Sequence, residues 1–271
     1  MTEQFSLLFI GCGNMGGAML QGWLASGLEA DRFTIIDPML DSAPDGVRLH
    51  RSLSEVYGKS FDAILLGFKP QQLVALAPEI ATHAHRNTQI LSILAGVELA
   101  VLRQYFPDSD AQVRIMPNLA ASLGKSPVAL ASDTLDEKDK ASVSALMNRL
   151  GTAEWIDESQ FDLVTALAGS GPGFVYRFID ALIQGAVTLG LPPEQAERLA
   201  VAMVDGASEL AAYSSDSPAE LARRVASPGG VTQVGLDILD EGNALQSLLT
   251  ATLRGASERS AQMAAEARKK S

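Results

Sequence analysis

The first part of the chain alternates short apolar runs with segments in which apolar residues recur every three to four positions. The runs have the length of buried strands, and the segments between several of them have the period of helices. The predicted strands are Leu7–Ile10, Phe33–Ile36, Ala63–Leu66, Gln89–Leu94, Gln112–Met116, Val128–Ala131 and Ala153–Ile156. The predicted helices include Gln71–Ile80, Glu98–Tyr105 and Glu137–Leu150. This alternation predicts a largely parallel sheet with helices on both faces.

From Gln160 onward the apolar residues recur only at helical spacing. After the segment Gly169–Gly173, a helix start or a kink, two apolar rows lie side by side on one predicted helix. One row is Phe174, Phe178 and Leu182, and the other is Val175, Ile179 and Ile183. So wide an apolar face favours an intertwined dimer, with the central helix of a monomeric helical domain as the alternative. Further helices are predicted at Pro193–Tyr213, Pro218–Ala226, Val231–Asp240 and Ala244–Ala265.

The first strand runs directly into a glycine-rich turn, Gly11-Cys12-Gly13-Asn14-Met15-Gly16, and a helical segment follows it. The second strand ends at Asp37, about twenty residues further on, as a G-x-G-x-x-G dinucleotide-binding fingerprint requires. In this interpretation Gly11 allows the tight turn, Gly13 lets a pyrophosphate approach the backbone, and Gly16 lets the helix pack closely on the strand. The pattern predicts a Rossmann-type dinucleotide-binding domain.

Ligands of parallel sheets bind beyond the carboxyl ends of the strands, so the residues that follow each predicted strand are candidate contacts. The candidates are Asp37, the turn Gly67-Phe68-Lys69-Pro70, Ala95 and Asn118. Each would be an ordinary turn residue if taken alone. Because they belong to the same rim of one sheet, together they predict a cofactor site.

A second glycine turn, Ser227-Pro228-Gly229-Gly230-Val231-Thr232, interrupts the helical half. Proline followed by two glycines ends a helix, and a new helical pattern begins immediately afterwards. We expect the residues from Ser227 to Thr232 to present free backbone N–H groups, which is an arrangement that binds anions. The turn contains no basic residue, so the backbone itself would hold the anion.

Composition narrows the class of protein. The chain has 271 residues and a net charge of -11, which disfavours nucleic acid or an anionic membrane as the main partner. It contains neither a run of eighteen uncharged apolar residues nor a basic, apolar leader pattern, so we expect a cytoplasmic protein. Cys12 is the only cysteine, which excludes intrachain disulfides and cysteine-rich metal sites. No metal is predicted.

These motifs resemble those of the pyrroline-5-carboxylate reductase family, which makes proline by reducing the C=N bond of a five-membered cyclic imine. The matching segments span nearly the whole chain. They are Gly11–Ala18, Phe68–Pro70, Arg114–Asn118, Gly169–Pro172 and Ser227–Thr232. The first motif is generic, whereas the last two, in this order after a dinucleotide domain, are specific to the family.

The resemblance implies a domain plan and a set of roles. It implies a dinucleotide-binding domain over residues 1–158 and an all-helical dimerisation and substrate-binding domain over 159–271, in a homodimer or a larger assembly of dimers. Residues Gly11 to Gly16 would hold the pyrophosphate, and Gly67 to Pro70 the ribose and nicotinamide side, of NADP or NAD. Thr232 would hydrogen-bond the ring nitrogen of the imino acid. The carboxylate would be bound by Ser227, Gly229, Gly230, Val231 and Thr232.

Two departures from the family pattern leave alternatives open. Leu119-Ala120 follows Asn118 where the family usually has threonine and proline. Asp37 suits the ribose hydroxyls of NAD and would repel a 2′-phosphate, whereas the family more often uses NADP. Ser42 and Arg48 would have to line that region if NADP were bound.

Three other functions share parts of this pattern. A β-hydroxy-acid dehydrogenase would need a lysine on the long helix after the sheet domain, but Gly171–Asp180 contains none. A non-catalytic regulator of the vitamin B6-homeostasis type could keep the cradle and lack turnover. A reductase of a related cyclic imine would differ only in pocket shape, because one methylene changes discrimination by about 1 to 3 kcal/mol.

Overall fold

The computed structural model describes residues 5–268 and divides the chain into two compact units. The sheet unit comprises the chain up to Ser170 together with the last helix from Gly255 onward, and the helical unit comprises Gly171–Arg254. No helix among the described residues is long and apolar enough to cross a membrane. The functional boundary between residues 158 and 159 stays a prediction.

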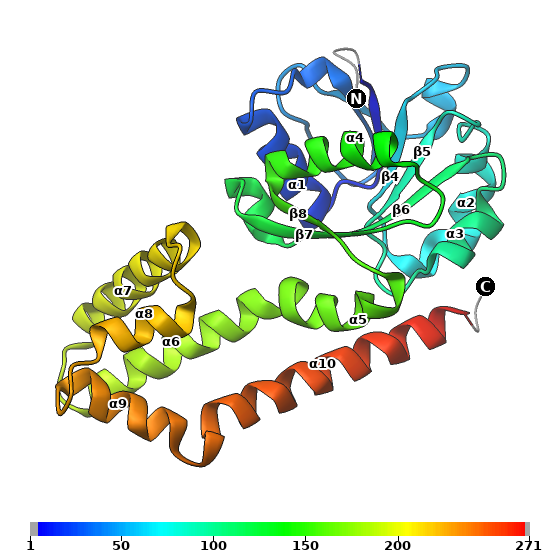
Figure 1. Cartoon of the computed structure of the whole chain (residues 1–271). Helices are drawn as coiled ribbons and strands as arrows, with labels where there is room; N and C mark the ends of the chain where they lie inside the picture. The colour runs from blue at the N-terminus through cyan, green and yellow to red at the C-terminus, as the bar shows by residue number, and fades with distance from the viewer. Residues whose placement is uncertain (1–4, 269–271) are drawn as a thin grey trace. The chain divides into compact units, whose positions relative to one another are not determined.

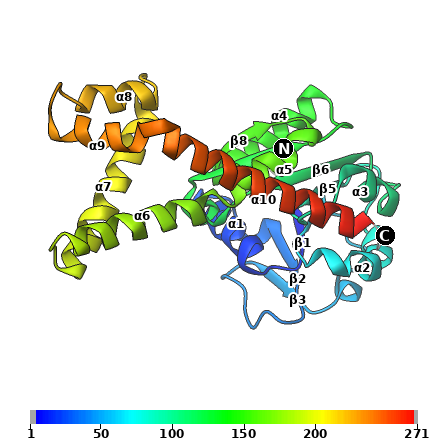
Figure 2. The same cartoon turned by 90° about the horizontal axis from the view of Figure 1, so that it is seen from below.

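The sheet unit is built on an eight-stranded sheet with the order β3-β2-β1-β4-β5-β6-β7-β8 (Figures 1 and 2). The strands are β1 Leu7–Ile10, β2 Phe33–Ile36, β3 Arg48–His50, β4 Ala63–Leu66, β5 Gln89–Ser92, β6 Ala111–Met116, β7 Ser126–Ala131 and β8 Gly151–Trp155. All neighbouring strands are parallel except β6 and β7, which are antiparallel. The predicted, largely parallel sheet is therefore confirmed.

The central strands are apolar throughout because both of their faces are covered. Every residue of β1, β2 and β4 is buried, which is typical of strands that lie between two layers of helices. Residues of β1 alternate between two apolar cores. Phe9 packs with Trp23 and Phe33 in one core, and Leu8 belongs to the other core.

Helices cover the two faces of the sheet. Helices α1 Asn14–Ala25 and α4 Glu137–Met147 contribute side chains to the core around Trp23. Helices α2 Leu73–Ala81 and α3 Leu99–Tyr105 contribute to the core around Leu8 (Figure 1). The loop between β1 and α1 and the loops after β2, β4 and β5 consequently emerge at one rim of the sheet.

Shorter helical turns connect these elements. The 3-10 turns are η1 Ala30–Arg32, η2 Leu53–Val56, η3 Pro70–Gln72, η4 Leu119–Leu123, η5 Asn148–Leu150 and η6 Glu158–Gln160, and they are followed by α5 Phe161–Val164 and the π-helical turn η7 Thr165–Gly169. The structure therefore shortens two predictions. Helix α4 ends at Met147, just before η5 begins. Strand β5 ends at Ser92, and the Ser92 Oγ accepts a hydrogen bond from Leu94 N–H in the turn that follows.

The helical unit contains α6 Gly171–Thr188, α7 Pro193–Tyr213, α8 Pro218–Val225, α9 Val231–Asp240 and η8 Glu241–Asn243, together with the first part of α10 Ala244–Arg268. Helix α7 begins at a proline and α9 begins after two glycines, and both match their predicted bounds residue for residue. Helix α10 extends beyond the predicted end at Ala265. Within α6, no residue is buried.

Candidate functional site

The glycine turn after β1 is closed by a backbone-to-backbone contact with the turn after β4. Gly11 has a φ of +79°, and a Cβ on this residue would lie 3.0 Å from the carbonyl oxygen of Gly67. A Cβ on Gly67 would lie 2.6 Å from the carbonyl oxygen of Gly11. Larger residues at these positions would push the two loops apart. Gly13 is the N-cap of α1 without any side-chain cap, so the helix N-terminus keeps N–H groups for an anion.

A cleft of about 640 Å³ opens along this rim of the sheet. Its size is within the range of small-molecule and cofactor sites. The structure brings together eight of the residues predicted to bind cofactor, all of which line the cleft. They are Gly11, Gly13, Asp37, Gly67, Phe68, Lys69, Pro70 and Ala95. Cys12 and Asn14 line a neighbouring depression, and Met15 and Gly16 continue α1.

Asp37 ties two loops of the cleft together. Its Oδ2 accepts a hydrogen bond from Cys12 N–H at 2.9 Å, and its Oδ1 accepts one from Met39 N–H at 2.9 Å. Burial of Cys12, and then the negative charge of Asp37, raise the pKa of the Cys12 thiol to about 11. Both effects favour the neutral thiol over the nucleophilic thiolate.

Arg51, Ser52 and Leu53 also line the cleft, and sequence reasoning missed them. They follow β3, a three-residue strand that the apolar pattern does not reveal. The Glu55 carboxylate accepts hydrogen bonds from Arg51 N–H at 2.8 Å and from Ser52 N–H at 3.1 Å. The Arg51 N–H bond, followed by the bond to His50, lowers the pKa of Glu55. The basic residues of the pattern Arg-Leu-His-Arg are the one signal that could have indicated this region.

Asn118 does not line the cleft and is buried elsewhere in the sheet unit. Its Oδ1 accepts a hydrogen bond from Ala120 N–H at 2.9 Å, capping η4. Its Nδ2 donates to the Ala168 carbonyl in η7 at 3.0 Å. The amide therefore fixes the π-helical turn just before the Gly-Ser-Gly-Pro motif, and its contact with cofactor stays a prediction.

The second glycine turn has the tight backbone that its sequence predicts. Gly229 has a φ of +70°, and the Gly230 N–H donates to the Ser227 carbonyl at 2.8 Å. The N–H of Gly230 is thus used within the turn, which corrects the expectation that every N–H from Ser227 to Thr232 is free. Gly230 is the N-cap of α9 without a side-chain cap, so the first turn of α9 presents its N–H groups. Val231 and Thr232 are exposed.

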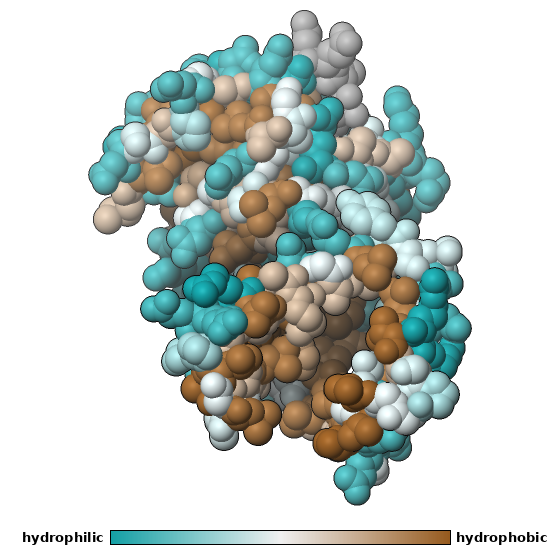
Figure 3. Space-filling view, turned by 90° about the vertical axis from the view of Figure 1, so that its left-hand side faces the viewer, coloured by the Kyte–Doolittle hydropathy of each residue, from teal (hydrophilic) through white to brown (hydrophobic). Residues whose placement is uncertain are grey.

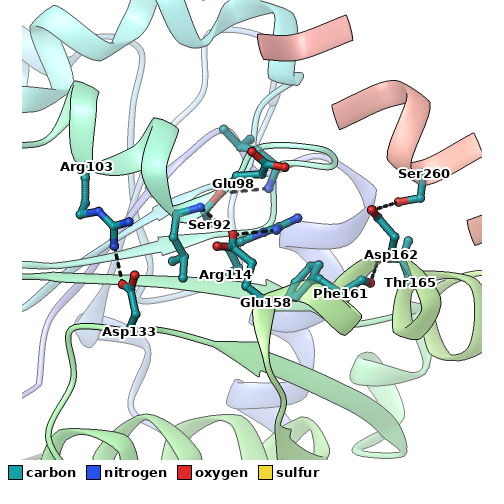
Figure 4. A network of polar contacts seen from close by, with 12 residues as sticks. Ser92, Glu98, Arg103, Arg114, Asp133, Glu158, Phe161, Asp162, Thr165 and Ser260 are labelled. Carbon is teal, nitrogen blue, oxygen red and sulfur yellow. Dashed lines mark hydrogen bonds and ion pairs between the residues drawn. The ribbon is translucent and has the colours of Figure 1, made fainter. Parts of the chain in front are cut away.

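A network of ionic and polar contacts supports the sheet unit beside η6 and α5 (Figure 4). The Arg114 guanidinium lies 2.8 Å from Glu158 Oε1 and 3.9 Å from the centre of the Phe161 ring. The same Glu158 oxygen accepts a hydrogen bond from Leu99 N–H at 2.7 Å. Ser260 on α10 donates to Asp162 at 2.7 Å. These contacts hold the segment after β8 against three other elements, namely β6, α3 and the end of α10.

Two family models match the chain. A model described as pyrroline-5-carboxylate reductase dimerisation matches residues 158–263, and one described as NADP oxidoreductase, coenzyme F420-dependent, matches residues 6–96. The two matches fall on the helical half and on the glycine-rich first half of the chain, respectively.

Known proteins match this chain over most of its length and over most of their own. A pyrroline-5-carboxylate reductase of Methanosarcina acetivorans is 32% identical over 96% of this chain and 98% of its own. The Arabidopsis thaliana enzyme is 32% identical over 94% of each chain. A solved Coxiella burnetii pyrroline-5-carboxylate reductase superposes with a TM-score of 0.88 at 27% identity, covering 96% of this chain and 98% of its own.

A solved Plasmodium falciparum pyrroline carboxylate reductase with NADP bound has a TM-score of 0.82 at 26% identity. The match covers 97% of this chain and the whole of the Plasmodium falciparum chain. The resemblance carried by the five motifs thus extends over both units. The chain belongs to the pyrroline-5-carboxylate reductase family.

Proposed function

We propose that this protein reduces the C=N bond of pyrroline-5-carboxylate to give L-proline, the last step of proline biosynthesis, with hydride from NADPH or NADH. The observation that carries the proposal is family membership over nearly the whole chain, with the Ser-Pro-Gly-Gly-Val-Thr turn intact. The cleft beside Gly11 supports a dinucleotide cofactor, because Gly13 has open space around it at the uncapped N-terminus of α1, where a pyrophosphate would approach the backbone.

Each part of the predicted site has a distinct task. Residues Gly11 to Gly16 present the N-terminus of α1 to the pyrophosphate. Gly67 to Pro70 and Ala95 hold the ribose and nicotinamide side. The substrate carboxylate is bound by Ser227, Gly229 and Gly230 of the turn and by Val231 and Thr232, which begin the uncapped first turn of α9. When bound, the reduced nicotinamide supplies the hydride.

The protein needs to add only positioning and a hydrogen bond. An imine protonates more easily than a ketone, and the iminium already accepts hydride, so a metal or a strong acid is unnecessary. Holding the imine carbon about 3 to 3.5 Å from the hydride donor supplies much of the acceleration. Thr232, which is exposed at the start of α9, donates its hydroxyl hydrogen bond to the ring nitrogen as the amine develops.

Thr232→Ala should lower kcat for pyrroline-5-carboxylate by about tenfold or more, while the Kd of the cofactor is nearly unchanged. The reason is that the hydroxyl stabilises the developing amine and does not contact the cofactor. The measurement is loss of nicotinamide absorbance with purified protein, NADPH or NADH, and the imine. Thr188→Ala is a matched control, because that hydroxyl bonds the Gln184 carbonyl of its own helix.

Two outcomes would count against the proposal. Absence of turnover by the unaltered protein with either cofactor would remove the enzymatic function, and turnover only with hydroxy or keto acids would favour a dehydrogenase. If Thr232→Ala left kcat at the level of Thr188→Ala, Thr232 would be a structural residue of the helix start.

The helical unit supports a homodimer. It leaves many large apolar side chains exposed, and Figure 3 shows apolar residues gathered over it around a hollow in the surface. Examples on α6 and α7 are Val175, Tyr176, Phe178, Leu199 and Met203. Such patches mark interaction surfaces. We expect light scattering to give the mass of a dimer, or of an assembly of dimers, at micromolar concentration, and a monomer would contradict this proposal.

The remaining partners follow from charge. The net charge of -11 supports a small imino acid, and neither nucleic acid nor an anionic membrane, as the main partner. We propose the cytoplasm as the location.

A further inference from the structure

Asp37 and Arg51, which follow β2 and β3, line the cleft, and a second acidic residue of its lining, Glu79, comes from α2. The end of β2 is where a Rossmann-type domain binds the adenosine ribose of its cofactor. NAD carries a free 2′-hydroxyl there, and NADP carries a phosphate. The way in which Asp37 and Arg51 are held therefore determines which cofactor the cleft accepts.

Asp37 is fixed in an orientation that leaves it able to accept further hydrogen bonds. Two backbone N–H groups, from Cys12 and Met39, each bond a different carboxylate oxygen. An ionised carboxylate offers about four lone-pair positions, so about two are left. Ribose hydroxyls can donate to them. A 2′-phosphate offers mainly acceptor oxygens and negative charge, so it would be repelled by a carboxylate that the two N–H bonds hold in place.

Arg51 is engaged by the loop that follows β2. Its Nη1 donates to the carbonyl of Asp37 at 3.1 Å and to the carbonyl of Leu40, and its Nη2 lies 3.5 Å from the carbonyl of Asp41. The adjacent backbone N–H of Arg51 is held by Glu55. Arg51 thus fixes the loop that carries Asp37 and Met39, and its guanidinium would have to leave these carbonyls to reach a phosphate.

The other basic side chains of this region point elsewhere. Arg48 donates to Thr34 Oγ1 at 3.1 Å and to the carbonyl of Asp31, and Ser42 lines the depression next to Cys12. Lys69, the second basic residue that lines the cleft, follows β4 and not β2 or β3. Of these two lining cations, Arg51 is the one with a hydrogen bond to Asp37, through the Asp37 backbone carbonyl.

We infer that the cleft selects NADH over NADPH, with Asp37 as the specificity-determining residue and Arg51 as the residue that holds its loop. The inference rests on the proposed function only for the class of cofactor. A solved Plasmodium falciparum relative has NADP bound. The preference for NADH is therefore inferred from this chain's own residues and not from its relatives.

The test is direct binding of NADH and NADPH to the full chain without substrate, by isothermal titration calorimetry. We expect a Kd for NADH that is about tenfold lower than that for NADPH, or lower still. Asp37→Ser should reduce that ratio to about threefold or less, because the charge is removed. Asp37→Asn removes the charge but keeps an acceptor oxygen for one of the two loop N–H groups, so it checks the effect with a side chain of the same shape.

Arg51→Ala is the matched variant at the same end of the cleft. If Arg51 only holds the loop, its loss weakens binding of both cofactors by a similar factor and preserves the preference for NADH. Tighter binding of NADPH by the unaltered protein, lost selectively in Arg51→Ala, would overturn the inference. It would also be overturned if both Asp37 variants kept the original ratio.

Binding without substrate separates this inference from the proposed function. A protein that selects NADH but does not reduce pyrroline-5-carboxylate would retain the inference and refute the function. A protein that reduces the imine at equal affinity for both cofactors would do the reverse. Because the ratio of two Kd values is measured on the same sample, a partly unfolded variant does not distort it.

Discussion

Replacing Arg114 by alanine should lower the free energy of unfolding of the sheet unit by about 3 to 5 kcal/mol. The Arg114 side chain is 6% exposed, and that of its partner Glu158 is 32% exposed. Truncation would remove the cation that faces Glu158 and would leave a gap beside the Phe161 ring. Glu158 would keep its hydrogen bond from Leu99 N–H but would lose its charge partner.

The matched control is Arg86→Ala. Arg86 lies 2.8 Å from Asp110, the same distance as in the Arg114 pair, but its side chains are 85% and 64% exposed. Because solvent screens such pairs, the control should cost less than about 1 kcal/mol. Urea unfolding can be followed by tryptophan fluorescence, since Trp23 and Trp155, the two tryptophans of the chain, both belong to the sheet unit. Equal losses in the two variants would show that burial does not strengthen the Arg114 pair.

A double variant separates charge from packing. Arg114→Met with Glu158→Gln removes both charges and keeps much of the volume, so it should recover part of the stability lost in Arg114→Ala. If the double variant were as unstable as Arg114→Ala, the loss would come from packing against Phe161 and not from an unpaired carboxylate.

The first half of the site could be predicted because its chemistry is local in the sequence. The spacing from Gly11 through Gly16 to Asp37 places a strand, a turn, a helix and a second strand within one βαβ unit. Parallel strands bring their carboxyl ends to one rim of the sheet, which is why the sequence alone assigns Gly67 to Pro70 and Ala95 to the same cleft.

The residues that the sequence did not reveal depend on contacts between distant segments. Strand β3 is three residues long and only partly buried, so it has no apolar run, yet it delivers Arg51 to the cleft. Asn118 follows a predicted strand as Asp37 does, but its amide turns to Ala168, fifty residues further along the chain. Neither the periodicity nor the turn chemistry near Asn118 contains that information.

The end of α10 is a similar case. Its amphipathic pattern predicts a helix, but the pattern does not specify which surface the helix contacts. A Cβ on Gly96 would lie 3.1 Å from the backbone nitrogen of Ala264, and Arg268 bonds the Glu98 carboxylate at 3.0 Å. The sequence separation of about 170 residues leaves such pairs without a local signal.

Gly22→Ala should destabilise the sheet unit by about 3 kcal/mol, although alanine is the better helix former by about 1 kcal/mol. Gly22 lies inside α1 and is buried against η4. An added Cβ would be 2.0 Å from the carbonyl oxygen of Ala121 and 2.9 Å from Leu150 Cδ2. The nearer atom belongs to the backbone, so α1 and η4 would have to move apart, opening the core around Trp23.

Gly17→Ala in the same helix is the control. A Cβ there would meet only the carbonyl oxygen of Cys12, at 4.0 Å, so helix propensity should dominate, and the variant should be as stable as the unaltered protein or gain up to about 1 kcal/mol. Urea unfolding monitored by tryptophan fluorescence compares the two. Opposite signs for one substitution on one helix would show that the approach of α1 to Ala121 outweighs propensity. If Gly22→Ala were also stabilising, η4 would have to yield without loss of packing.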